Sequence, residues 1–271
     1  MKLGIIAGNR YLPLLVAQRI KQQNPAAHVT AICFKGETDR RIAGYCDSFF
    51  WLKVGELERL VRLLKDNGLS TCIMAGQISP TSIFYRKHWD DSMRAVADSC
   101  RDFRPHAIFQ AIIAYLGQSG ISFQDSTFCL QNDLSTRGFL TIEPEPEVLK
   151  DIEMGVAIAS RYVELDVGQT LVVKHGSVLA LEALEGTDRT IQRAHCIGGT
   201  GTTVIKFAKH NQDLRFDVPV VGLNTLRLLS RLGAVSLVLE AGKVIILEKQ
   251  LFLSRARALK IAVVGREKVR G

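Results

Sequence analysis

Acidic, basic and glycine residues occur close together in residues 206–225, KFAKHNQDLRFDVPVVGLNT. Two carboxylates in this stretch, Asp213 and Asp217, are four residues apart. Arg215 lies between them, and Lys206 precedes them. Burying such side chains costs free energy unless each finds a partner. Carboxylates bind divalent cations, and basic side chains neutralise phosphate oxygens. The composition therefore indicates a site that holds a metal ion and a phosphate together.

The residues that follow Asp217 bear on its burial. The apolar run VPVVG predicts that the chain enters a core here, so this carboxylate should be half-buried. The alternative is that both aspartates form surface ion pairs with Lys209 and Arg215, which contribute little to stability. We favour the functional interpretation, and we include Thr225, at the end of the same stretch, among the substrate contacts.

A second acidic group lies upstream in LEALEGTD, where Glu182, Glu185 and Asp188 fall within seven residues. The pattern predicts the end of a strand and the start of a helix. Carboxylates at such a junction are typical of half a site for a hard cation such as Mg²⁺. The alternative is a structural role, in which Thr187 or Asp188 caps the helix. Capping and metal binding are compatible with each other. We expect Glu182, Glu185, Gly186 and Thr187 to contact substrate.

Two glycine turns in the first half of the chain also carry polar side chains. They comprise Gly8, Asn9 and Arg10 in IIAGNR, and Gly76, Gln77 and Ser79 in AGQISPT. The first turn lacks the GxGxxG spacing of a dinucleotide site, yet amides at a helix N-terminus can bind a phosphate or a sugar hydroxyl. The amide and hydroxyl groups of the second turn suit uracil, ribose or sugar recognition. The alternatives are a plain strand-to-helix turn and helix capping by Ser79.

The elements that must position these groups alternate between strand and helix in the first half. Apolar runs at residues 3–8, 28–34 and 72–76 predict strands, and helical spacing occurs at residues 12–22 and 55–65. Continuous apolar strands between amphipathic helices predict a parallel sheet covered on both faces. We therefore expect a Rossmann-like domain, whose ligands bind at the carboxyl ends of its strands.

Two prolines, Pro144 and Pro146, interrupt regular structure and predict a domain boundary. We place the Rossmann-like N-terminal domain at residues 1–140, a linker at 141–147 and a catalytic C-terminal α/β domain at 148–271. Strand pairs joined by turns occur among the helices of the second half, so its sheet should be mixed.

The composition narrows the class of protein. With 47% hydrophobic and 23% charged residues, the chain is typical of a soluble globular protein. No stretch approaches the ~18 apolar residues of a membrane-spanning helix, and the N-terminus lacks a signal-peptide pattern, so we expect a cytoplasmic protein. Six cysteines without a CxxC pair argue against a zinc site or a disulfide scaffold.

The net charge is +8, and residues 251–271 are notably basic. A basic surface can attract anionic lipid, so we expect peripheral contact with the inner membrane. Basic residues are not interleaved with aromatic ones and no nucleic-acid motif occurs, so we expect no nucleic-acid partner. A homodimer is a further expectation.

These motifs together resemble a known family. QDLRFDVPVVG and VLALEALEGTDRTIQRA are similar to the signature segments of LpxI-type UDP-2,3-diacylglucosamine pyrophosphatases, bacterial enzymes of lipid A synthesis. IIAGNRYLP and AGQISPT occur in the same order as in that family, so the resemblance covers nearly the whole chain.

The resemblance implies a two-domain hydrolase that cleaves the pyrophosphate bond of an amphipathic UDP-sugar lipid. The expected products are UMP and lipid X (2,3-diacylglucosamine 1-phosphate), and the expected cofactor is Mg²⁺. The family's essential aspartate falls on Asp217. We expect Asp217, Asp213 and Lys206 to be catalytic, Asp217, Asp188 and Asp213 to ligate the metal, and Arg215 to neutralise phosphate.

Three other classes of function remain open at this point. A non-catalytic nucleotide-sugar-binding or regulatory protein could be built from the same α/β halves. A nicotinamide-dependent oxidoreductase fits the strand–glycine–helix start, although the glycine spacing is absent. An RNA-binding protein is favoured by net charge alone.

Overall fold

The structure is a computed structural model that describes residues 2–79, 86–100, 105–209 and 212–269. The chain forms two compact units. The first comprises Met1–Leu130 with Leu214–Phe216, and the second comprises Gln131–Asp213 with Asp217–Gly271. Residues 141–147, where the sequence analysis places a linker, belong to the second unit.

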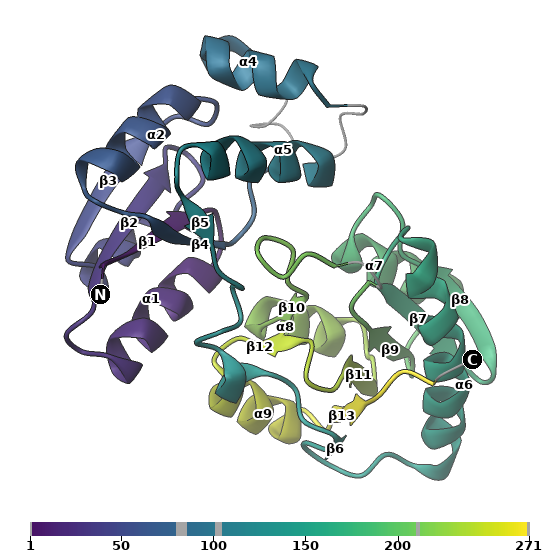
Figure 1. The fold of residues 1–271 in the computed structure, drawn as a ribbon. Coiled ribbons are helices and arrows are strands. Elements are labelled where there is room, and N and C mark those ends of the chain that lie inside the picture. Colours follow the sequence, from purple (N-terminus) through teal and green to yellow (C-terminus); the bar gives the residue numbers. More distant parts are fainter. Residues whose placement is uncertain (1, 80–85, 101–104, 210–211, 270–271) are drawn as a thin grey trace. The chain divides into compact units, whose positions relative to one another are not determined.

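The first unit is built on a parallel sheet (Figure 1). In the described part of the chain its strands are β1 (Lys2–Ala7), β2 (His28–Phe34), β3 (Ser48–Leu52), β4 (Thr71–Ala75) and β5 (Ser122–Phe123). They are arranged β3-β2-β1-β4-β5, and each neighbouring pair is parallel. The Rossmann-like parallel sheet predicted from the apolar runs is thereby confirmed. The strand order reverses between β1 and β4, which makes the carboxyl ends of these two strands the switch point where such sheets bind ligands.

Helices cover both faces of this sheet, which explains why its central strands are continuously apolar. The described α-helices of the unit are α1 (Leu12–Gln23), α2 (Leu57–Asp66), α4 (Asp91–Asp98) and α5 (Pro105–Gln118). Short 3-10 helices lie at Arg40–Gly44 (η1) and Arg86–His88 (η2). Ile6 and Ile32 of the sheet pack with buried residues of α2, α4 and α5, whereas α1 packs against β1 and β4.

The second unit contains a mixed sheet, as predicted. Its described strands are β6 (Gly138–Phe139), β7 (Thr170–Lys174), β8 (Ser177–Leu181), β9 (Thr203–Lys206), β11 (Ser236–Glu240) and β13 (Ala262–Arg266), in the order β6-β13-β11-β9-β7-β8. The three strands β9, β11 and β13 are parallel, whereas β7 is antiparallel to both of its neighbours and β6 is antiparallel to β13. A small parallel pair, β10 (Val220–Val221) and β12 (Ile245–Ile246), lies outside this sheet.

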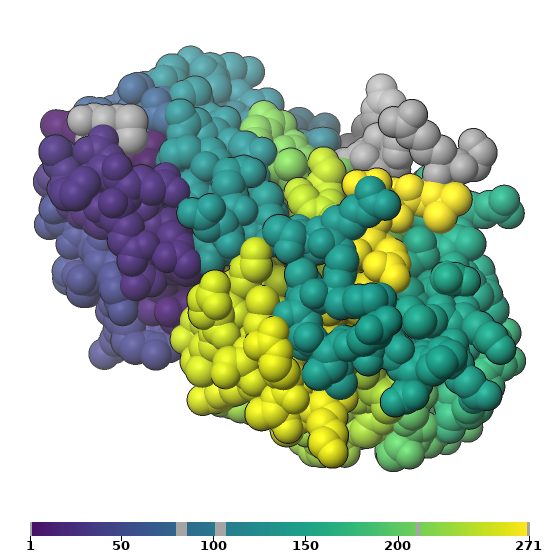
Figure 2. Space-filling model, turned by 90° about the horizontal axis from the view of Figure 1, so that it is seen from below, coloured from purple at the N-terminus to yellow at the C-terminus, as the bar shows by residue number. Residues whose placement is uncertain are grey.

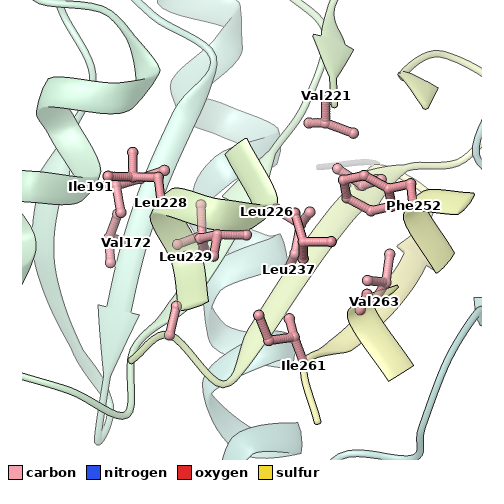
Figure 3. Close-up of a cluster of buried hydrophobic side chains, with 14 of the residues drawn as sticks. Val172, Ile191, Val221, Leu226, Leu228, Leu229, Leu237, Phe252, Ile261 and Val263 are labelled. Carbon is pink, nitrogen blue, oxygen red and sulfur yellow. The ribbon is translucent and has the colours of Figure 1, made fainter. Parts of the chain in front are cut away.

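Four α-helices described in the second unit sandwich its large sheet: α6 (Pro146–Tyr162), α7 (Thr187–Gly198), α8 (Leu223–Arg231) and α9 (Lys249–Ala258). Alternate residues of β7 face opposite layers, as the period of a strand requires. Val172 packs with α7, α8 and α9 in the core drawn in Figure 3, whereas Leu171 and Val173 pack with α6. Short 3-10 helices lie at Gln131–Asp133 (η3) and Val163–Leu165 (η4).

The chain that precedes α6 is fastened to the last part of the second unit. In Figure 2 the yellow surface of α9 borders the teal surface of this segment. Arg257 of α9 donates to the main-chain oxygen of Leu140 at 3.1 Å, and the Thr141 hydroxyl donates to the main-chain oxygen of Ile261 at 2.8 Å. None of the helices in the described ranges has the length and apolar character needed to cross a membrane.

Candidate functional site

A buried polar cluster lies at the end of β9 in the second unit. Lys206, the last residue of β9, is 6% exposed, and its Nζ donates to the Thr187 hydroxyl at 3.1 Å. That hydroxyl lies 3.3 and 3.4 Å from the two carboxylate oxygens of Glu182, which is also 6% exposed. An ammonium can only donate and a carboxylate can only accept, so Thr187 accepts from Lys206 and donates to Glu182.

The antiparallel strand β7 explains how these residues meet. Thr170, at its start, is opposite Lys206 on β9, and its main-chain oxygen accepts from the Glu182 amide at 2.8 Å. The Thr170 hydroxyl also lies 3.0 Å from that of Thr187, the first residue of α7. The structure therefore brings together Glu182, Thr187 and Lys206, which the sequence analysis selected from two separate stretches.

The cluster has the properties of an anion site. Gly186 precedes α7 with φ 81°, and within the described part of the chain no side chain caps this helix. The N-terminus of a helix carries partial positive charge and presents main-chain N–H groups. Lys206 adds a positive charge beside this N-terminus, so the lysine and the helix together suit a bound anion such as a phosphate.

The remaining acidic residues of LEALEGTD are placed differently. Glu185 pairs with Arg193 at 2.6 Å and accepts from the Ala183 amide at 3.0 Å. The hydrogen bond from the Arg193 guanidinium lowers the pKa of Glu185 to about 2. Glu185 thus braces the loop before α7. Asp188 lies exposed in the first turn of α7.

A tight turn joins the two aspartates that head the sequence analysis. The Asp217 amide donates to the main-chain oxygen of Asp213 at 2.8 Å, and both residues are partly buried. Half-burial of Asp217 was expected from the apolar run that follows it. Thr225 lies further along, in the first turn of α8.

The residues inside this turn belong to the first unit. The Ser126 amide donates to the main-chain oxygen of Leu214 at 3.0 Å, and its hydroxyl donates to that of Arg215 at 2.8 Å. The Phe216 ring stacks on Phe109 of α5, with centroids 5.6 Å apart. The Arg215 side chain lines a shallow cavity beside α5 and β5. These contacts, all within the first unit, hold Leu214–Phe216 in place.

The fit of a divalent cation can be judged from the carboxylates present. Within the described residues no group of three or more His, Cys, Asp or Glu side chains is arranged to hold a metal ion. Asp188, Asp213 and Asp217 are therefore not gathered into one such group. Magnesium, however, is commonly held by one or two carboxylates together with waters and substrate phosphates. Asp213 and Asp217 are two carboxylates on one short turn, which is the number that such binding uses.

The two glycine turns of the first unit lie side by side. The Gly8 amide donates to the main-chain oxygen of Ala75 at 2.8 Å, and the Asn9 amide donates to that of Gln77 at 2.7 Å. A Cβ on Gly8 would collide with the Gln77 main chain. Gly76 has φ +83°, and a Cβ there would collide with the Asn9 main chain. Both glycines are thus required for the close approach of these turns.

Glu37 was missed by the sequence analysis, although it holds both turns. Its carboxylate accepts from the Asn9 side-chain amide at 2.8 Å, from the Ser79 amide at 3.1 Å and from the Ser79 hydroxyl. The available signal was an acidic residue shortly after the second strand, where dinucleotide-binding sheets place one. Arg10 and Gln77 are exposed. Pro80 and Thr81, which complete AGQISPT, lie outside the described residues.

Comparisons with known proteins match both halves of the chain. The model of the LpxI N-terminal domain matches residues 2–132, and that of the LpxI C-terminal domain matches residues 136–264. The protein named UDP-2,3-diacylglucosamine pyrophosphatase LpxI of Caulobacter vibrioides is 25% identical over 275 residues, which cover 97% of each chain.

Solved structures resemble the chain much less. The biotin carboxylase domain of Hydrogenobacter thermophilus 2-oxoglutarate carboxylase is 14% identical, with a TM-score of 0.29 over 72% of this chain and 40% of that chain. The glycinamide-RNase-transformylase T of Mycobacterium tuberculosis is 17% identical, with a TM-score of 0.25 over 68% of this chain and 44% of that chain. The chain thus spans less than half of either structure.

Proposed function

The chain belongs to the LpxI family, and from this premise we propose that it hydrolyses the pyrophosphate bond of UDP-2,3-diacylglucosamine to UMP and lipid X. It is thus an enzyme, a hydrolase of lipid A biosynthesis, and the resemblance found in its motifs is confirmed. The observation that carries the proposal is the match of both family domains in order along the chain, together with a pyrophosphatase relative aligned over 97% of it.

The polar cluster at the start of α7 gives the activity a structural basis. Cleavage of a pyrophosphate requires neutralisation of charge on the phosphate oxygens and an aligned water. Lys206 offers a positive charge whose position is fixed by Thr187, and α7 offers its N-terminus. We assign phosphate binding to these groups. Glu182 orients the Thr187 hydroxyl that holds Lys206.

The Asp213–Asp217 turn supplies the acidic part of the site. We propose that these two carboxylates hold Mg²⁺, and that Asp217 also orients the attacking water. When bound, the ion would polarise phosphate oxygens and lower the pKa of its water. The main-chain hydrogen bond between the two residues keeps their carboxylates on one short turn. Arg215, between them, is proposed to neutralise further phosphate charge.

Release of UMP in the presence and absence of magnesium tests this function. The purified chain with UDP-2,3-diacylglucosamine and Mg²⁺ is expected to release UMP. An excess of chelator should abolish the release, and added Mg²⁺ should restore it. Undiminished turnover in chelator contradicts the metal assignment. Tight binding of the UDP lipid without any UMP release supports the rival class, a non-catalytic nucleotide-sugar-binding protein.

Exposed apolar side chains near the polar cluster fit a substrate with acyl chains. Leu184, in the loop after β8, is fully exposed, and Leu165, at the end of η4 and just before the loop that leads into β7, is 70% exposed. A Cβ on Gly168 would collide with the main-chain oxygen of Glu182, so the two loops are neighbours. We propose that this apolar edge touches the anionic inner-membrane surface in which the substrate lies.

Vesicle flotation tests the membrane contact. The double variant Leu165→Ser, Leu184→Ser should bind anionic phospholipid vesicles about tenfold more weakly than the unmodified chain, because two exposed leucine side chains lose their burial in lipid. Phe139→Ser is the control, since Phe139 is exposed on β6, the strand at the opposite edge of the sheet. Equal binding by all three proteins, or binding indifferent to anionic lipid, contradicts the proposal.

A further inference from the structure

Two side chains of the second unit hold the main chain of Ala208, a residue that follows β9 and is 4% exposed. The Ala208 amide donates to the Glu240 carboxylate at 2.7 Å, and the Ala208 carbonyl oxygen accepts from Lys268 Nζ at 2.8 Å. The same ammonium lies 3.6 Å from the Glu240 carboxylate. We call these three residues the Ala208 clamp. It joins the carboxyl ends of β9 and β11 to the segment that follows β13.

Glu240 supplies an acceptor where the ladder between β9 and β11 has ended. The last pair of that ladder is Lys206 with Leu239, so Ala208 lies beyond it. A buried main-chain N–H without an acceptor costs about as much free energy as a lost hydrogen bond. A carboxylate is a stronger acceptor than a peptide carbonyl, because the hydrogen bond is assisted by charge. The Glu240 side chain therefore holds the chain at this point more firmly than a further strand pair would.

Lys268 compensates the buried charge of this carboxylate. Glu240 is 7% exposed, and burial raises the pKa of its carboxyl group above the ordinary value. The positive charges of Lys268 and of the exposed Lys243 oppose this rise, and Lys268 has the larger effect. A buried carboxylate is stable only when cations and hydrogen-bond donors surround it. The two side chains of the clamp thus depend on each other.

The segment that carries Lys268 is itself held at both ends. The Ala241 amide donates to the main-chain oxygen of Arg266 at 2.8 Å, and the Val269 amide donates to the Ser160 hydroxyl at 3.0 Å. Ser160 belongs to α6, toward which the yellow chain runs after β13 in Figure 1. Lys268 therefore reaches Ala208 from an ordered segment, which lowers the entropic cost of its hydrogen bond.

The clamp lies where the chain sets out toward the acidic part of the site. Ala208 comes two residues after Lys206 and five before Asp213. The chain after β11 also supports the far side of the same turn, since β12 pairs with β10, which begins three residues after Asp217. The approach to Asp213 and the exit from Asp217 are thus both attached to the chain at and after Glu240.

We propose that Glu240 and Lys268 are positioning residues of the hydrolase. By holding both main-chain groups of Ala208, they fix the direction in which the chain leaves β9, and with it the place of Asp213 relative to Lys206. They act without touching the substrate. Misplacing a catalytic group by about 1 Å can lower a rate by about a hundredfold, so a support of this kind affects turnover. This inference rests on the proposed function, because it concerns the geometry of that site.

Steady-state kinetics of Lys268→Met with UDP-2,3-diacylglucosamine tests the inference. The variant loses the donor to the Ala208 carbonyl and the cation beside Glu240. We expect kcat to fall by about tenfold, the effect of losing one hydrogen bond from a charged group, while KM stays unchanged. Lys268→Arg keeps the charge and the N–H donors, so it should recover most of the lost kcat.

Lys243→Met is the matched control. Lys243 also attracts the Glu240 carboxylate, but it is exposed, and it is Lys268 that donates to Ala208. The control should therefore keep the kcat of the unmodified chain. Equal loss of kcat in Lys243→Met and Lys268→Met, an unchanged kcat in Lys268→Met, or no recovery in Lys268→Arg each overturns the inference.

A double variant separates lost positioning from lost folding. Lys268→Met alone leaves the Glu240 charge without its nearest cation, which can lower stability. Lys268→Met, Glu240→Gln removes both charges and keeps similar side-chain volumes, so its melting temperature should stay close to that of the unmodified chain. Its kcat should remain reduced. A folded double variant with normal kcat overturns the inference.

Hydrogen exchange of the full chain tests the clamp without any turnover. The Ala208 amide should exchange about tenfold faster in Lys268→Met, because the clamp opens more often once one of its hydrogen bonds is missing. The amides of β7 should keep their rates, and uniformly faster exchange across the sheet overturns the inference. Release of UMP that is indifferent to Lys268 rejects this inference alone, whereas no release by the unmodified chain rejects the proposed function as well.

Discussion

Replacing Asp217 by asparagine is expected to lower kcat/KM for UDP-2,3-diacylglucosamine by about a thousandfold or more, the loss typical of removing a group that acts on the reacting atoms. The substitution removes a negative charge while keeping the shape of the side chain. The main-chain hydrogen bond from the Asp217 amide to Asp213 remains available, so the turn should persist. Steady-state kinetics together with a thermal melt separates lost chemistry from lost folding.

Asp166→Asn provides the control for this loss. Asp166 is an exposed carboxylate of the same unit, and it lies 3.3 Å from Lys209. An exposed pair of this kind contributes little to stability, so the variant should keep near-normal turnover and melting temperature. Near-normal turnover in Asp217→Asn contradicts the role of Asp217. Loss of folding in that variant indicates a structural role for the carboxylate.

The second large effect is expected from the buried lysine. The double variant Lys206→Met, Glu182→Gln removes both charges of the cluster and keeps similar side-chain volumes. Neutral replacement of buried charges is often harmless to stability, so the melting temperature should stay close to that of the unmodified chain. Turnover should fall by about a hundredfold or more, the effect of removing one group that stabilises developing charge.

Lys174→Met is the control for the double variant, because it removes a different lysine of the same sheet. Lys174 lies at the other end of β7, where its Nζ donates to the main-chain oxygen of Gly198 at 2.7 Å. Its replacement removes a hydrogen bond, so it should lower stability and leave kcat/KM unchanged. A Lys206 double variant that keeps full activity, or one that loses activity only because it unfolds, contradicts the assignment of phosphate binding.

The sheets could be predicted because their strands have a strong local signal. Residues 72–76 are continuously apolar and residues 29–34 are apolar except for Thr30, as is typical of strands covered on both faces. The same logic located the glycine turns at Gly8 and Gly76, since each directly follows a buried strand. The residues that face those turns from elsewhere could not be located in this way. Glu37 is a single acidic residue in a turn, and its role depends on the strand order.

The polar cluster in the second unit also depends on pairing between strands that are distant in the sequence. Lys206 meets Thr187 and Glu182 because β7 runs antiparallel to β9 with Thr170 opposite Lys206. A register of that kind depends on the whole sheet and leaves no local pattern in the sequence. The placement of Leu214–Phe216 in the first unit was missed for a similar reason. A short segment that packs on distant residues has no periodicity of its own.

A single-turnover reaction followed by phosphorus NMR shows directly whether this protein hydrolyses the pyrophosphate bond. The chain is mixed in excess with UDP-2,3-diacylglucosamine and Mg²⁺, and the same mixture with Asp217→Asn serves as the blank. We expect the diphosphate resonances to disappear and the monophosphate resonances of UMP and lipid X to replace them, with no change in the blank. Persistence of the diphosphate resonances, or their conversion to UDP, would contradict hydrolysis of the pyrophosphate bond by this protein.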